Sequence, residues 1–112
     1  MRLPRPEDAV VDEAKIRDYL LSESHPVGRF KALVFRRIGY VSQNWQTLAA
    51  DLKRFARDND AVAIDSNAFG RKYAVRGTLK GPKGDLSLAT VWIVLVGETF
   101  PRFVTAYPRP KS

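Results

Sequence analysis

The sequence predicts an α+β fold in which about three N-terminal helices pack on one face of a four-stranded antiparallel meander sheet. Apolar residues recur with a helical period up to about residue 58, and after Asn59 the period falls to about 2, as in strands. Short turn-forming segments separate the later stretches, and short connections join antiparallel neighbours. The length of 112 residues is typical of one domain, so a single domain over residues 1–112 is expected.

The helical part is expected at residues 11–58, after an extended arm at residues 1–10 that contains Pro4 and Pro6. Apolar stripes predict helices at residues 12–22, 29–38 and 42–57. Asp12 and Ser42 are suited to cap the first and third helices, and Gly39 is placed to end the second.

The sheet is expected at residues 60–108, with strands at residues 61–65, 72–79, 86–96 and 102–107. The connections at residues 67–70, 81–84 and 97–101 are rich in Gly, Pro and Asn. Residues 109–112 are expected to form a loose tail.

Positive charge is concentrated in the second part of the chain. The net charge is +7, and residues 70–112 contain eight Lys and Arg against two Asp and Glu. Such a field attracts phosphates and indicates RNA as a partner; the alternative is a basic surface that serves solubility alone.

Several kinds of site are absent from the sequence. One histidine and no cysteine provide no zinc constellation, and the carboxylates lack the paired spacing of two-metal nucleases, so no metal is predicted. No Gly-rich phosphate loop precedes a helix, so no cofactor and no nucleotide cofactor are expected. The longest apolar run, residues 89–96, is too short to span a bilayer, and the first residues lack a signal-peptide core; a soluble protein with no membrane partner is expected.

Strand alternation predicts an RNA-binding face on the side of the sheet away from the helices. We expect this face to combine cations, hydroxyls and rings, which single-stranded RNA requires, and Arg102 to contribute at its end. Its expected members are Lys72, Arg76, Thr90, Trp92, Thr105 and Tyr107. Phe103 is expected on the same face as Thr105, whereas Tyr73 and Val75 are expected to point inward. The alternative is that the rings pack in a second small core or in a dimer interface.

His25 and Lys31 are the candidate catalytic residues outside the sheet. His25 is the sole histidine and lies in a loop shaped by Pro26 and Gly28, and histidine suits acid–base catalysis near neutral pH. Lys31, six residues later, could reach the same region. The alternatives are a loop histidine that caps a helix and a solvated helical lysine.

The sequence resembles an uncharacterised bacterial domain family. The resemblance covers nearly the whole chain and is most specific in the His-Pro-x-Gly-x-x-Lys-Ala segment that begins at His25 and in Thr90-Val91-Trp92. The order of helices followed by four strands also resembles the fold of the barnase, EndoU, colicin E5/D and RelE-like toxin ribonucleases.

That second resemblance implies a metal-independent ribonuclease in which a ribose 2′-oxygen attacks the adjacent phosphate. His25 would act as base or acid, and Thr105 and Tyr107 would position the phosphate. Stabilisation of the developing charge would come from Lys31, Lys72 or Arg76.

The expected partners are RNA and an acidic antitoxin or immunity protein, which would cover the basic surface. The expected site of action is the cytoplasm, and delivery as part of a larger toxin is compatible with the sequence. The alternative is a non-catalytic nucleic-acid or protein-binding module that uses the same face. An immunity or antitoxin role is disfavoured, because neutralisers of basic nucleases tend to be acidic.

Overall fold

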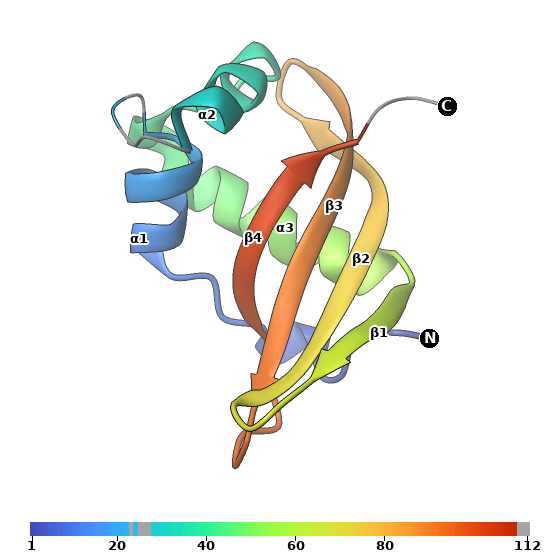
Figure 1. Ribbon diagram of the computed structural model, residues 1–112. Coiled ribbons are helices and arrows are strands. Elements are labelled where there is room, and N and C mark those ends of the chain that lie inside the picture. The colour runs from blue at the N-terminus through green and yellow to red at the C-terminus, as the bar shows by residue number, and fades with distance from the viewer. Residues whose placement is uncertain (23, 25–27, 110–112) are drawn as a thin grey trace.

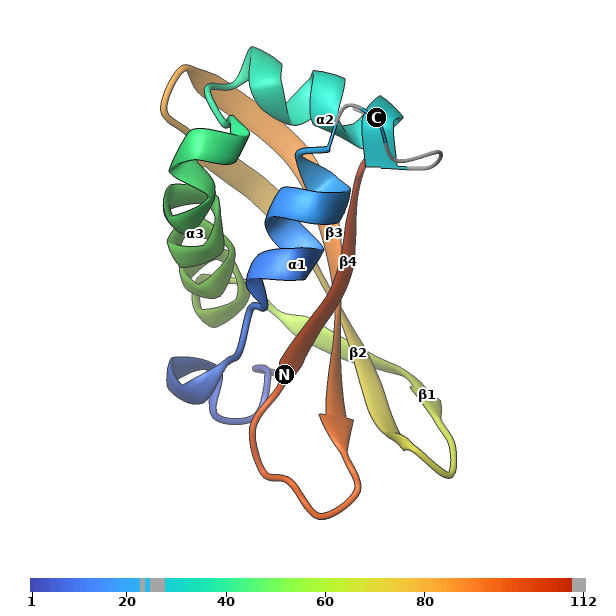
Figure 2. The ribbon, with the colours of Figure 1, turned by 90° about the vertical axis from the view of Figure 1, so that its left-hand side faces the viewer.

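Helices lie on one side of a four-stranded antiparallel sheet in the computed structural model, which describes residues 1–22, 24 and 28–109, without the side chains of residues 28–30 (Figures 1 and 2). The strands follow one another in the order β1-β2-β3-β4, which confirms the expected meander. They are β1 (Ala61–Ser66), β2 (Gly70–Gly81), β3 (Gly84–Leu95) and β4 (Arg102–Pro108).

The helical part differs from the prediction mainly at the helix starts. The helices are η1 (Pro6–Asp8), α1 (Glu13–Lys15), η2 (Ile16–Leu20), α2 (Gly28–Arg37), η3 (Ser42–Asn44) and α3 (Trp45–Asp58). Of these, η1 and η3 are 3-10 helices and η2 is a π-helix. Asp12 occupies the N-cap position of α1 but makes no side-chain cap hydrogen bond. Asn44, and not Ser42, is the N-cap of α3. Gly39 follows α2 with φ of 104°, a conformation that suits glycine and ends the helix as expected.

The N-terminal segment is attached to both edge strands of the sheet. The Ala61 amide donates to the carbonyl of Met1 beside β1, and the Phe103 amide donates to the carbonyl of Val10 beside β4. Leu3 and Ala9 are buried in the core. The expected extended arm is therefore only partly right, because apolar side chains and backbone bonds hold this segment against the domain.

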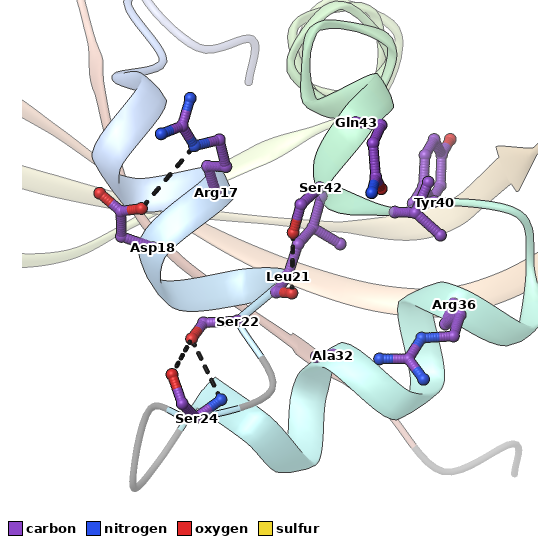
Figure 3. Close-up of a pocket in the computed structure, with 11 residues that line it drawn as sticks. Arg17, Asp18, Leu21, Ser22, Ser24, Ala32, Arg36, Tyr40, Ser42 and Gln43 are labelled. Carbon is purple, nitrogen blue, oxygen red and sulfur yellow. Dashed lines mark hydrogen bonds and ion pairs between the residues drawn. The ribbon is translucent and has the colours of Figure 1, made fainter.

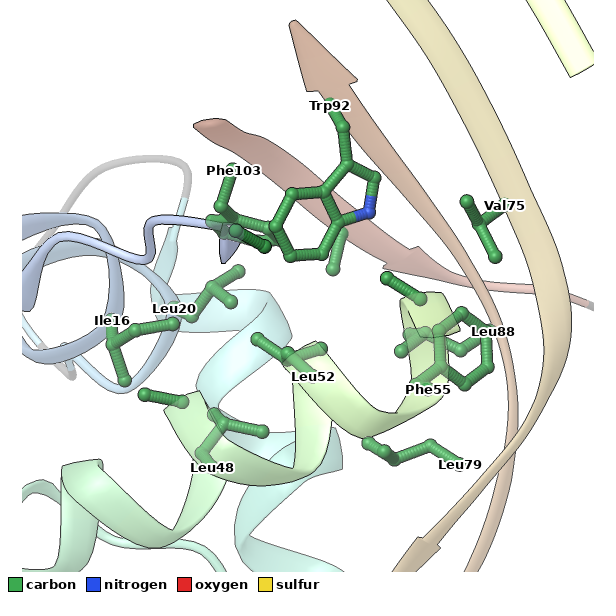
Figure 4. Packing of buried hydrophobic residues seen from close by; sticks show 14 of the residues in the cluster. Ile16, Leu20, Leu48, Leu52, Phe55, Val75, Leu79, Leu88, Trp92 and Phe103 are labelled. Atoms are coloured by element: carbon green, nitrogen blue, oxygen red, sulfur yellow. The ribbon is translucent and has the colours of Figure 1, made fainter. Parts of the chain in front are cut away.

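Trp92 lies at the centre of the core, between the sheet and the helices (Figure 4). Its side chain is fully buried and meets Phe103 of β4 edge to face, with ring centroids 5.4 Å apart. The indole nitrogen donates to the Thr90 hydroxyl at 2.8 Å, and that hydroxyl donates to the Val75 carbonyl at 3.3 Å. Other core residues come from η2, α3 and the strands, including Ile16, Leu20, Leu48, Leu52, Phe55, Leu79 and Leu88.

The predicted exposure of Thr90 and Trp92 is therefore wrong. Strand β3 is apolar on both faces, so alternation alone could not decide which set of residues the helices cover. Trp92 has the largest side chain of β3, and Thr90 on the same face accepts a hydrogen bond from its N–H group, so the polar atom of the ring is satisfied when this face is buried.

A shift of register in β4 made a second prediction about the faces of the sheet wrong. The pairing of β3 with β4 shifts between Val91 and Trp92, so Thr105 lies opposite Val91 and Phe103 lies opposite Trp92. Phe103 and Thr105 therefore lie on opposite faces although they are two residues apart, as a β-bulge allows. The expectation that Phe103 accompanies Thr105 is wrong, whereas Tyr73 and Val75 of β2 are buried as predicted.

We predict that Thr90→Val lowers the free energy of unfolding by about 1–3 kcal/mol, because the buried Trp92 N–H group loses its acceptor. Thr78→Val is the matched control, since Thr78 is an exposed residue of β2, and it should change stability by less than about 0.5 kcal/mol. Urea denaturation of the three proteins gives the comparison. Equal stability of the two variants would contradict the role assigned to this hydrogen bond.

Candidate active site

Tyr19, Lys31 and Thr105 meet beside the edge of the sheet formed by β4. The Lys31 ammonium donates to the Tyr19 hydroxyl oxygen at 2.7 Å and to the Thr105 hydroxyl oxygen at 3.0 Å. It also lies 4.9 Å from the centre of the Tyr19 ring. We call these three residues the Lys31 cluster. It joins η2, α2 and β4, so residues from three distant parts of the sequence contribute to it.

The hydrogen bonds to the Tyr19 oxygen favour the ionised form of the phenol. The hydrogen bond from Lys31 lowers the pKa of Tyr19, partial burial raises it, and a hydrogen bond from Thr105 lowers it further; the net pKa is below the ordinary value. Donors that bond to the charged form of an acid favour that form. The Lys31 cluster therefore contains a phenol from which a proton is removed more easily than usual.

The face of the sheet opposite α3, which we call the open face, carries cations and polar groups near the Lys31 cluster. Strand register places Arg76 and Tyr107 on either side of Ala89, and Lys72 and Arg102 on either side of Ile93. Thr105 lies in the row between these two rows, opposite Val91. No helix of the described part of the chain crosses this face (Figures 1 and 2). The structure therefore brings together Lys72, Arg76, Arg102, Thr105 and Tyr107 as expected, without Thr90 and Trp92.

Arg102 differs from the other open-face cations in having a close carboxylate partner. Its guanidinium makes two hydrogen bonds to Glu98, both of 2.8 Å. This bidentate contact lowers the pKa of Glu98 below its usual range. A phosphate at Arg102 would therefore have to compete with Glu98, whereas no ion pair is found for Lys72 or Arg76 among the described residues.

His25 lies outside the described residues, so its candidate role stays a prediction. Within the described ranges no three His, Cys, Asp or Glu side chains gather in a way that could hold a metal ion. The same part of the chain contains no helix long and apolar enough to cross a membrane.

The sequence matches the model of the family described as "Domain of unknown function (DUF6883)" over residues 2–110. The chain belongs to this family. No curated protein matches it significantly. A family model that spans nearly the whole chain agrees with the uncharacterised domain family expected from the sequence.

The fold is similar to that of a chain in a solved complex, the contact-dependent growth inhibition toxin–immunity protein complex from Klebsiella pneumoniae 342. The TM-score is 0.70, with 21% sequence identity, and the similarity covers 95% of this chain and 97% of that chain. At this identity the similarity establishes the shared fold only.

Tyr19 is the member of the Lys31 cluster that sequence reasoning missed. It falls in the apolar stripe of the first helix with Ile16 and Leu20, and that pattern assigned its ring to the core. A tyrosine at the margin of such a stripe can present its hydroxyl group to a polar partner while its ring packs. The sequence contains no local signal that this partner is Lys31.

We predict that Tyr19 titrates below the ordinary tyrosine pKa of about 10. The difference in tyrosinate absorbance between the native protein and Tyr19→Phe isolates this residue from the other tyrosines. In a Lys31→Met background the midpoint should rise, because the largest cause of the lowered pKa is lost while burial still raises it. An unchanged midpoint would mean that Lys31 does not act on the phenol.

Proposed function

We propose that this chain is the toxin domain of a contact-dependent growth inhibition type of system and that it cleaves RNA without a metal ion. The observation that carries the proposal is the Tyr19 oxygen held between the Lys31 ammonium and Thr105, at the edge of a basic open face. The fold shared with a chain of a toxin–immunity complex supports the biological class. The reaction is attack of a ribose 2′-oxygen on the adjacent phosphorus.

The Lys31 cluster supplies the groups that this reaction needs. A base removes the 2′-hydroxyl proton as the O2′–P bond forms, and an acid gives a proton to the 5′-oxygen as the P–O5′ bond breaks. Tyr19, with its lowered pKa, serves as base, and His25 is proposed as the acid on its chemistry alone. Lys31 stabilises the charge that develops on the phosphorane oxygens, while Thr105 and Tyr107 position the phosphate.

The open face gives RNA a path to the Lys31 cluster. Lys72 and Arg76 neutralise phosphates, and the exposed ring of Tyr107 offers a surface on which a base stacks. Tyr107 lies two residues from Thr105 on β4, so a nucleotide stacked there has its phosphate near the proposed catalytic groups. Arg102 contributes after release from Glu98.

The toxin role is favoured over the immunity role by charge. The similar complex contains both a toxin and an immunity protein, so the shared fold alone is compatible with either. The net charge of +7 suits a protein that binds RNA, and its protein partner would then be an acidic immunity protein or antitoxin. The proposed site of action is the cytoplasm of the target cell, with delivery as part of a larger toxin.

The second candidate is a non-catalytic nucleic-acid or protein-binding module that uses the open face. It is favoured by the same cations and by Tyr107, and it needs no chemistry at the Lys31 cluster. Growth arrest on expression and RNA cleavage in the presence of EDTA belong to the toxin alone, so these two measurements separate the candidates.

We predict that Lys31→Met lowers the rate of RNA cleavage by at least about 10²-fold, because the phosphorane charge loses its cation. Expression of the native chain in bacteria should arrest growth, and expression of Lys31→Met should not. Lys53→Met is the matched control, since Lys53 is an exposed residue of α3, and it should keep both activities.

Three further measurements make this experiment decisive. Thermal melting shows whether Lys31→Met is folded, and Lys31→Arg, which keeps the positive charge, should recover part of the rate. His25→Ala should abolish cleavage without changing the melting temperature. A folded Lys31→Met protein that cleaves RNA at the native rate, or native cleavage that EDTA abolishes, would refute the proposed chemistry.

We predict that RNA binding weakens steeply with salt, with a log–log slope of about −2 to −4 if about three to five single-strand phosphates are neutralised. Lys72→Gln and Arg76→Gln should each make the slope shallower by about 0.7, whereas Lys53→Gln should leave it unchanged. Fluorescence anisotropy with a labelled oligonucleotide over a series of salt concentrations measures the slope. Equal slopes in all four proteins would remove the open face from the RNA path.

A further inference from the structure

A pocket of about 550 Å³ lies between η2, α2 and the segment that leads into η3 (Figure 3). Arg17 and Asp18 of η2 form one wall, Ala32 and Arg36 of α2 form another, and residues 40–43 close the third side. We call it the α2 pocket. It is separate from the Lys31 cluster, and none of the reaction steps proposed above uses it.

Two guanidinium groups and several neutral polar groups line the α2 pocket. In Figure 3 the Arg36 side chain lies along α2, on the opposite side of the pocket from Arg17 of η2. Ser22 and Ser42 contribute hydroxyl groups, and Gln43 contributes an amide. Guanidinium groups bind phosphate through paired N–H donors, while hydroxyl and amide groups suit a ribose or the edge of a base.

Arg17 is held by carboxylates that a phosphate can replace. It bonds to Glu13 at 2.5 Å and lies 3.9 Å from Asp18, and all three side chains are about half exposed or more. Ion pairs exposed in this way contribute little, because water screens them. Exchange of one carboxylate partner of Arg17 for a phosphate therefore costs little free energy.

The α2 pocket and the Lys31 cluster share two structural elements. Ala32 of the pocket follows Lys31 on α2, and Asp18 of the pocket precedes Tyr19 on η2. Consecutive residues of an α-helix such as α2 point in directions about 100° apart, and Asp18 and Tyr19 are likewise consecutive in the π-helix η2, so the two sites occupy adjacent sides of the same pair of helices. One RNA strand can thus contact both sites.

We infer that the α2 pocket binds one nucleotide of the RNA substrate next to the cleaved position, with one flanking phosphate at Arg17 and the other at Arg36. This inference rests on the proposed function and deepens it, since it names a subsite that selects the substrate. The polar groups of residues 22 and 42–43 then contact the sugar or base. Its contribution is to substrate binding and not to the chemical step.

The test compares Arg36→Gln with Arg37→Gln. Both are exposed arginines of α2 and both changes remove one positive charge, but Arg37 does not line the pocket. The probes are the four 3′-mononucleotides and inorganic phosphate. Their binding is measured from the changes in backbone amide chemical shifts. We expect the mononucleotides to perturb residues of the α2 pocket and Arg36→Gln to weaken binding by about tenfold, as for loss of one charge-assisted bond. Arg37→Gln should change it by less than about twofold.

Cleavage kinetics provide the second readout. Arg36→Gln should raise KM with kcat nearly unchanged, in contrast to Lys31→Met, which lowers kcat. Equal effects of the two arginine variants, no shifts at the pocket, or inorganic phosphate binding as tightly as the mononucleotides would overturn the inference. Mononucleotide binding at the pocket of a protein that cleaves no RNA would leave the subsite standing and refute the ribonuclease. Native RNA cleavage together with an unaltered KM in Arg36→Gln would refute the subsite and leave the ribonuclease standing.

Discussion

The burial of Trp92 determines which side chains of the sheet face the solvent. An indole ring in a core needs an acceptor for its N–H group, and Thr90, two residues earlier on the same strand face, provides it. Once Trp92 and Thr90 lie under the helices, alternation turns Val91 and Ile93 to the open face. The register of β2 and β4 then places Lys72, Arg76, Thr105 and Tyr107 beside them. The face on which Trp92 is buried thus determines where the proposed RNA path lies.

The sequence was sufficient to predict the elements and their order, because the change of apolar period and the turn residues are local signals. It could not predict the faces of β3, since Leu88, Trp92 and Val94 on one side are matched by Val91 and Ile93 on the other. In β4 the prediction failed at a bulge, where Phe103 and Thr105 separate. A bulge of this kind depends on the neighbouring strand, which a single sequence does not identify.

The residues of the candidate site were likewise predictable from the sequence only in part. Lys31 and Thr105 were proposed from residue type and approximate position, and the structure places their polar atoms 3.0 Å apart. Tyr19 was not proposed, since its spacing is that of a core residue and its hydroxyl group acquires a role only when α2 and β4 are in place. The α2 pocket is likewise formed by three elements, and no single segment contains its pattern.

The distance along the chain between the members of the Lys31 cluster has a consequence for when the site exists. Lys31 and Thr105 are 74 residues apart in sequence, and β4 is held at its edge by Val10 of the N-terminal segment. Contacts between such distant segments form slowly, because the chain must first close a large loop. A chain that is still being synthesised, or that has been unfolded for transport, therefore has no assembled site. On the proposed function, the domain becomes toxic only after β4 has paired with β3 and α2 has packed beside it, so the rate of folding determines when activity begins.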